Sequence, residues 1–124
     1  MSEDGLAIGI RPVGVAHITD EPDVMVIETD TAFSDALLRI EEQEHLLVLY
    51  WMHGLGEQDR NVLQVHPRGD LSRPLHGVFA THSPMRPNPI GVTRVELVKV
   101  EATRLFVRGL DARDGSPVID VKSG

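Results

Sequence analysis

The segment best suited to chemistry spans residues 81–91 and reads THSPMRPNPIG. Its three prolines restrict the backbone, so polar side chains between them lose little entropy when they bind a ligand. Arg86 offers five donors in a planar fork, and Asn88 both donates and accepts. The segment is consistent with a rigid ligand-binding loop, and also with a stiff crossover between strands in which Arg86 pairs with an acid. The residues leave both open.

A second candidate is the acidic turn at residues 111–117, which reads DARDGSP. Asp111 and Asp114 precede Gly115, and Asp, Gly, Ser and Pro are typical of ordinary hairpin turns. The same residues also suit the rim of a pocket, where a carboxylate accepts a hydrogen bond from a ligand hydroxyl or ammonium group. Both interpretations stay open at this point.

A continuous apolar run covers residues 46–52, with the sequence LLVLYWM. Its length predicts a central strand that is covered on both faces. Tyr50, Trp51 and Met52 then belong to core packing, although Met52 also suits an apolar pocket wall. His53 follows the run and precedes Gly54, so we expect it at the mouth of a pocket.

Histidine, cysteine and glycine patterns argue against several common kinds of site. The chain has no cysteine, and its six histidines form neither an H-x-H pair nor an H-E-x-x-H motif, so no metal is expected. Gly54 and Gly56 lack the third glycine and the βαβ unit of a dinucleotide-binding fold.

Short elements must position these residues, because eight prolines and eleven glycines interrupt the chain. Apolar side chains at positions 33, 36, 37 and 40 predict one amphipathic helix of about three turns. About eight short strands complete a mainly β fold, and a small closed or partly open β-barrel would remove their exposed edges. We expect a single domain over residues 1–124, with strands at 6–17, 24–27, 46–52, 61–66, 77–81, 91–100, 105–107 and 118–121.

The charge balance excludes a non-specific nucleic-acid coat protein, which would be basic. The chain carries 12 basic and 19 acidic residues, a net charge of −7. Residues 1–62 hold 13 acids and three bases (−10), whereas residues 63–124 hold six acids and nine bases (+3), which permits an anion-binding face there. No apolar run approaches the roughly 20 residues that span a bilayer. With an acidic start unlike a signal peptide, the sequence predicts a cytoplasmic protein.

Four stretches together closely resemble the TsaA-like, or TrmO, family. They are PVGVA at residues 12–16, LLVLYWMH at 46–53, GVFATHSPMRPNPIG at 77–91 and GLDARDGSPVIDVK at 109–122. The proline-spaced stretch is the most specific. The resemblance implies a small β-barrel, usually a homodimer, that binds S-adenosylmethionine and methylates the nitrogen of threonylcarbamoyl-adenosine beside the anticodon of certain tRNAs.

Carried over residue by residue, the resemblance implies a cofactor site and a substrate side. The positions expected to bind the cofactor are His53, Gly54, His82, Val92, Ala112, Arg113, Asp114 and Gly115. The positions expected on the substrate side are Arg86, Asn88 and Lys122. The proline-spaced segment and the acidic turn should therefore meet in one crevice.

Three departures from the family pattern bear on activity. A Pro-Arg-x-Gln loop after the first strand is missing, because residues 17–22 run almost directly into the second strand. His82 replaces the usual Arg with a titratable group, and the sequence stops at Gly124 without the family's Tyr. We therefore keep three hypotheses: a methyltransferase on modified tRNA, a non-catalytic S-adenosylmethionine-binding module, and a methyltransferase on a small molecule. Alignment supplies much of the rate of a methyl transfer, so no catalytic base is assigned.

Overall fold

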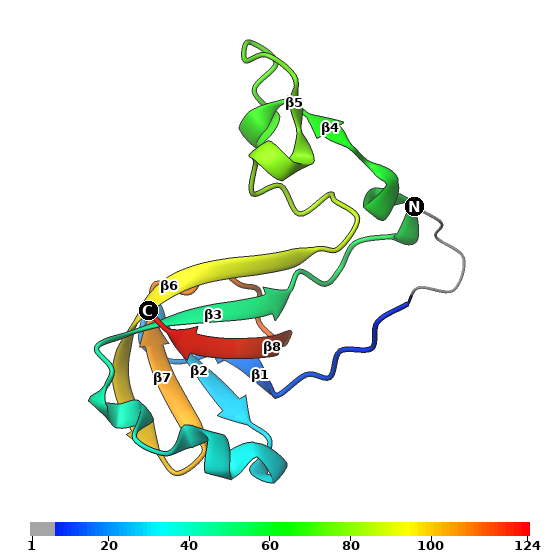
Figure 1. The fold of residues 1–124 in the computed structure, drawn as a ribbon. Coiled ribbons are helices and arrows are strands. Elements are labelled where there is room, and N and C mark those ends of the chain that lie inside the picture. Colours follow the sequence, from blue (N-terminus) through cyan, green and yellow to red (C-terminus); the bar gives the residue numbers. More distant parts are fainter. Residues whose placement is uncertain (1–6) are drawn as a thin grey trace.

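A closed six-stranded antiparallel β-barrel forms the body of the protein in a computed structural model that describes residues 7–124 (Figure 1). The strands follow the order β1-β2-β7-β6-β3-β8 around the barrel. The expected mainly β fold is thereby confirmed. The barrel strands are β1 (Gly14–Ile18), β2 (Val24–Thr29), β3 (His45–Trp51), β6 (Ile90–Glu101), β7 (Arg104–Arg108) and β8 (Ser116–Ser123).

Alternate side chains of each strand fill the barrel interior. In β3, Leu46, Val48 and Tyr50 point inward and are at most 4% exposed. The residues between them, Leu47 and Leu49, are only half-buried within the described chain. The prediction that residues 46–52 are covered on both faces is therefore wrong, because in a barrel one face of every strand points outward.

Strand β6 brings two parts of the barrel together because its twelve residues pair with β3 at one end and with β7 at the other. The register against β7 shifts between Leu97 and Lys99, and such a bulge bends a strand and increases its twist. The first residues of β6 consequently lie beside the end of β3, where Tyr50 pairs with Gly91.

The segment predicted as one amphipathic helix forms two 3-10 helices, η1 (Thr31–Leu37) and η2 (Ile40–Glu42). Between them Arg39 adopts a left-handed conformation with φ of 66°, which interrupts the helical repeat before a third turn. The apolar spacing still holds in part, since Leu37 and Ile40 pack against the barrel core. None of the helices within residues 7–124 is long and apolar enough to cross a membrane.

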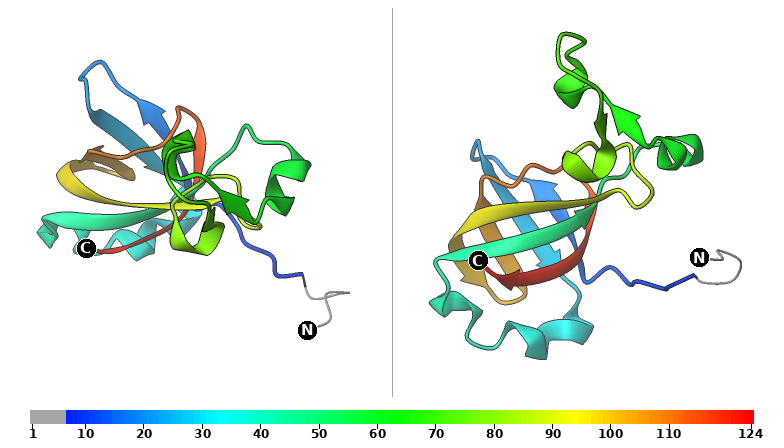
Figure 2. Two further views of the ribbon diagram at one scale, coloured as in Figure 1. Left: turned by 90° about the horizontal axis from the view of Figure 1, so that it is seen from above. Right: turned by 45° about the horizontal axis from the view of Figure 1, so that its top comes forward.

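Residues 54–89, here called the lobe, leave the barrel after β3 and return to it at β6. Figure 1 and the right view of Figure 2 show that the lobe projects from one end of the barrel. The strand predicted at 61–66 is reduced to two residues, which pair outside the barrel with His76–Gly77. The strand predicted at 77–81 is wrong for residues 78–80, which form a 3-10 helix. Frequent Pro and Gly limit longer pairing here. The lobe contains η3 (Glu57–Asn61), β4 (Gln64–Val65), η4 (Pro67–Gly69), β5 (His76–Gly77) and η5 (Val78–Ala80).

Candidate functional site

A cavity of about 460 Å³ is lined by the end of β3, the start of β6, the lobe and the acidic turn. Both candidate segments reach it, so the expectation that they meet in one crevice is confirmed. The proline-spaced segment contributes His82, Pro84 and Arg86, and the acidic turn contributes Asp111, Ala112 and Arg113.

The strand ends supply an apolar wall to this cavity. Met52, Leu55, Ile90 and Val92 all line it. Val92 is 44% exposed because its side chain points away from the barrel interior, on the opposite face from its buried neighbour Gly91. The N–H of Met52 donates to the carbonyl of Pro89 at 2.7 Å, which joins the two strands where the lobe begins and ends.

Tyr50 links the barrel wall to the acidic turn. Its hydroxyl donates to the backbone carbonyl of Asp111 and lies 3.1 Å from Oγ1 of Thr93. Burial, together with the charge of Asp111, raises the pKa of the Tyr50 hydroxyl above its ordinary value, and the Thr93 hydrogen bond partly offsets this. A Cβ at Gly91 would lie 2.5 Å from the Tyr50 ring, so glycine is needed there to seat the ring.

Ser116, at the start of β8, joins His53 to the acidic turn. Its buried hydroxyl lies 2.6 Å from the carbonyl oxygen of Arg113 and 3.3 Å from Nδ1 of His53. Gly54, which follows His53 in the chain, has φ of +89°, and a Cβ there would lie 2.9 Å from Nη1 of Arg113. Glycine therefore serves both the left-handed backbone and the close approach of a guanidinium group.

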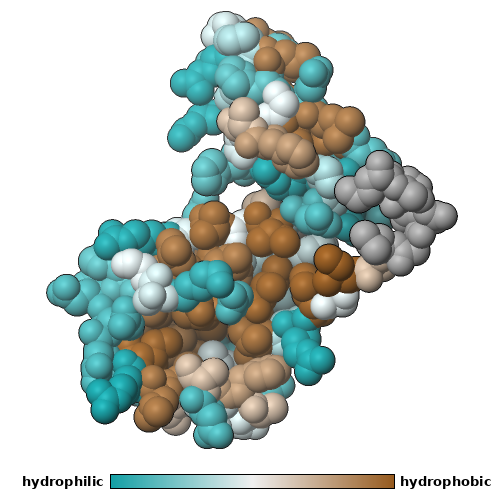
Figure 3. Space-filling model, viewed as in Figure 1, coloured by the Kyte–Doolittle hydropathy of each residue, from teal (hydrophilic) through white to brown (hydrophobic). Residues whose placement is uncertain are grey.

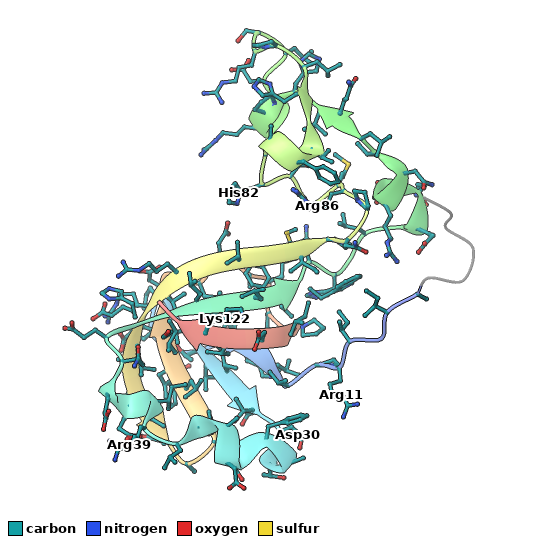
Figure 4. All side chains as sticks on the ribbon, in the orientation of Figure 1. Arg11, Asp30, Arg39, His82, Arg86 and Lys122 are labelled. Atoms are coloured by element: carbon teal, nitrogen blue, oxygen red, sulfur yellow. The ribbon has the colours of Figure 1, made fainter. Side chains whose placement is uncertain are left out.

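Arg86 holds its own loop together. Its Nη1 donates to the carbonyls of Thr81 at 3.0 Å and Ser83 at 2.9 Å. The sequence left open a ligand-binding loop and a crossover in which Arg86 pairs with an acid. In the structure, Arg86 binds backbone carbonyls of its own segment in place of an acid, and it also lines the cavity. Figure 4 shows His82 and Arg86 between the upper part of the lobe and the barrel.

Asp114 faces strand β1 and is outside the cavity lining. Its Oδ1 accepts from the N–H of Ile18 at 2.9 Å and lies 3.4 Å from Nδ1 of His17. Gly115, also outside the lining, has φ of +84° and donates its N–H to the carbonyl of Ala16 at 2.7 Å. These two predicted residues thus fasten the turn to β1.

Asn88 and Lys122 are also outside the lining. Oδ1 of Asn88 accepts from Nη2 of Arg60 at 3.1 Å, and Nζ of Lys122 pairs with the Asp120 carboxylate at 3.1 Å. Lys122 borders a separate hollow beside η2, and Figure 4 shows it on the barrel wall, apart from Arg86.

Sequence reasoning did not single out Leu55, Thr93 and Ser116, all of which line the cavity. Hydroxyl residues such as Thr93 and Ser116 are common in strands. Only their position beside the candidate segments in the folded chain identifies them as site residues. Within residues 7–124, no group of three His, Asp or Glu side chains is placed to hold a metal ion.

Residues 15–123 match the model of the tRNA-methyltransferase O N-terminal domain family. The chain belongs to this family. Among solved structures, a crystal structure of TrmO superposes with a TM-score of 0.74 and 29% identity, covering 96% of this chain and 58% of that one.

Relatives of this TrmO-family chain have two kinds of name. A probable S-adenosyl-L-methionine-binding protein of Methanocaldococcus jannaschii is 40% identical over 114 residues, which is 91% of this chain and 89% of that protein. The tRNA (adenine(37)-N6)-methyltransferase of Mus musculus is 39% identical over 87 residues, which is 70% of this chain and 20% of that protein. This chain therefore spans most of the archaeal relative but only a fifth of the mouse enzyme.

Proposed function

We propose that the cavity binds S-adenosylmethionine. The observation that carries the proposal is the meeting of the proline-spaced segment and the acidic turn in one cavity of about 460 Å³, a size typical of small-molecule sites. The archaeal relatives named as probable S-adenosyl-L-methionine-binding proteins, 40% and 45% identical to this chain, support it.

The residues of the lining fit the chemical groups of this ligand. S-adenosylmethionine carries a sulfonium, an ammonium, a carboxylate and an adenine. Met52, Ile90 and Val92 offer an apolar wall, while the Asp111 carboxylate suits the ammonium group and the Arg113 guanidinium suits the carboxylate. His53, His82 and Ala112 complete the proposed contacts.

The remaining predicted cofactor residues act on the shape of the cavity in this proposal. Gly54 makes room for Arg113, whereas Asp114 and Gly115 fasten the turn to β1. On the substrate side, Arg86 lines the cavity, whereas Asn88 lies outside the lining and accepts a hydrogen bond from Arg60. Lys122 would meet a large substrate only at the barrel wall.

We further propose that the protein is an enzyme that transfers a methyl group to a nitrogen of a modified nucleoside in tRNA, with threonylcarbamoyl-adenosine as the substrate. The bound ligand supplies an electrophilic methyl group. The residues of the chain contribute by holding the acceptor in line with that group, which removes much of the entropic barrier. Family membership and the mouse tRNA methyltransferase relative support this reaction.

Two measurements test the proposal. Calorimetry on ligand-stripped protein should show S-adenosylmethionine binding, and an absence of binding up to millimolar concentration would refute it. Transfer of a labelled methyl group should occur to tRNA that carries threonylcarbamoyl-adenosine and not to the same tRNA without the modification.

A second candidate function is a binding module that holds S-adenosylmethionine without turnover. It is favoured by relatives that are named only as binding proteins and of which this chain covers about nine tenths. Turnover of labelled S-adenosylmethionine with modified tRNA would exclude this candidate. The acidic net charge of −7 keeps open a small-molecule acceptor, and strongly salt-dependent tRNA binding would count against that acceptor.

We also propose a single-domain homodimer in the cytoplasm. The half-buried outer residues of β3, Leu47 and Leu49, provide an apolar surface suited to a second copy. Sedimentation at several protein concentrations tests the dimer.

A further inference from the structure

The hydroxyl of Ser116 determines which nitrogen of His53 carries a proton. Oγ of Ser116 lies 2.6 Å from the carbonyl oxygen of Arg113 and 3.3 Å from Nδ1 of His53. A hydroxyl donates one proton, and two lone-pair oxygens only 2.6 Å apart would repel, so the proton must point at the carbonyl. The Ser116 oxygen then accepts from Nδ1. Neutral His53 therefore carries its proton on Nδ1 and leaves Nε2 as an acceptor.

The surroundings of Ser116 hold this arrangement in place. Ser116 is 1% exposed, so solvent has little access to the hydroxyl. The same Arg113 carbonyl also accepts from the N–H of Ser116 at 3.1 Å, and Ser116 pairs with Ala16 of β1. Backbone contacts thus fix Ser116 and the Arg113 carbonyl that its hydroxyl faces, and the imidazole of His53 must adapt to them.

Two other side chains in the cavity lining are able to accept a proton, His82 and Asp111. Both are exposed, and within residues 7–124 neither side chain has a hydrogen bond or ion pair. His53, by contrast, is half-buried and held at Nδ1. A general base is effective when a second group fixes its orientation, and His53 is the lining residue that meets this requirement.

We propose that Nε2 of His53 accepts the proton that the methyl acceptor loses, and that Ser116 is its positioning residue. The inference rests on the proposed function. As the acceptor nitrogen forms its bond to the methyl carbon, the carbon–sulfur bond breaks and its electron pair stays on sulfur. The N–H proton of the acceptor passes to Nε2, and the resulting imidazolium returns it to water. Atoms and charge balance without another reactant.

The tautomer is measurable without any ligand. Nitrogen-15 labelling of histidine and long-range nitrogen–proton correlation at about pH 8.5, where an unperturbed imidazole is neutral, should show the His53 proton on Nδ1. His53→Asn assigns the signal by removing it. In Ser116→Ala the proton should shift toward Nε2. A proton on Nε2 in the unchanged protein, or an unaltered tautomer in Ser116→Ala, would overturn the proposal.

A second measurement separates proton transfer from shape. His53→Asn keeps an N–H near the Nδ1 position, so it can still donate to Ser116, but it has no Nε2. It should keep thermal stability, while methyl transfer measured at saturating S-adenosylmethionine falls by about 100-fold or more. Transfer at the unchanged rate would overturn the proposal. If the unchanged protein binds no S-adenosylmethionine, the proposed function fails, whereas the tautomer measurement still decides the assignment of His53.

Discussion

At the scale of single residues, the hydroxyl of Tyr50 connects the acidic turn to the barrel. Tyr50→Phe keeps the ring over Gly91 and removes the hydroxyl that donates to the Asp111 carbonyl. We expect a loss of about 1 kcal/mol in the free energy of unfolding, together with weaker ligand binding because the turn loosens. Urea denaturation and calorimetry measure both. Thr93→Val is the matched control, since it removes only the other partner of the hydroxyl and should leave the turn attached.

The same residue gives the protein a testable response to alkaline pH. Burial raises the pKa of Tyr50 in the folded state, so the unfolded chain releases this proton at lower pH than the folded one. The contribution of neutral Tyr50 to stability is thus complete below about pH 10 and declines as pH rises above it. Tyr50 is the only tyrosine in the sequence, so tyrosinate absorbance reports it directly. An ordinary titration in the folded protein, or an equal alkaline decline in Tyr50→Phe, would contradict this account.

Asp114 offers a second prediction at this scale, because its carboxylate contacts β1 and not the cavity. Asp114→Ala removes the acceptor for the N–H of Ile18 and should lower the free energy of unfolding by about 1 kcal/mol. Asp114→Asn keeps an oxygen for that N–H and should retain most of it. Both are measured by urea denaturation. A large loss of ligand affinity in Asp114→Asn with unchanged stability would instead indicate direct ligand contact.

At the scale of elements, the sequence predicted what local spacing governs and missed what the closed barrel imposes. The strands predicted at 91–100 and 105–107 correspond to β6 and β7, each of which has one buried face. The continuous apolar run at residues 46–52 predicted cover on both faces of the strand, but the outward face of β3 is only half-buried. The apolar spacing predicted one helix, but the left-handed backbone conformation of Arg39 separates two 3-10 helices. The residue type of Arg39 gives no clear signal for that conformation.

The candidate site was likewise predictable from the sequence only in part. Its segments were predictable from unusual composition, namely spaced prolines and an acidic glycine turn. The direction of each side chain was not, because it depends on partners distant in sequence: Asp114 turns toward Ile18, and Ser116 toward His53. The contacts that orient these residues span 96 and 63 positions along the chain.

The proline-spaced segment makes its own prediction as an element. Arg86→Ala removes two hydrogen bonds to the carbonyls of Thr81 and Ser83, so amide exchange over residues 81–86 should accelerate, by about tenfold. Arg68→Ala, at an exposed position in η4, is the matched control and should leave exchange there unchanged. Hydrogen exchange read by mass spectrometry checks this. Equal exchange in both variants would mean that the prolines alone hold the loop.

At the scale of the whole molecule, the outer face of the barrel remains to be explained. Figure 3 shows apolar side chains gathered over the barrel in the orientation where β3 and β8 face the viewer. An exposed apolar patch of this kind is typical of an interaction surface, and the proposed homodimer would cover it. Leu49→Arg places a charge on this face and should shift the protein to monomers in sedimentation experiments. Leu38→Arg, at a side chain that is already 82% exposed beside η1, should leave the dimer intact. A monomeric unchanged protein, or a Leu49→Arg variant that still dimerises, would place the function of this face elsewhere.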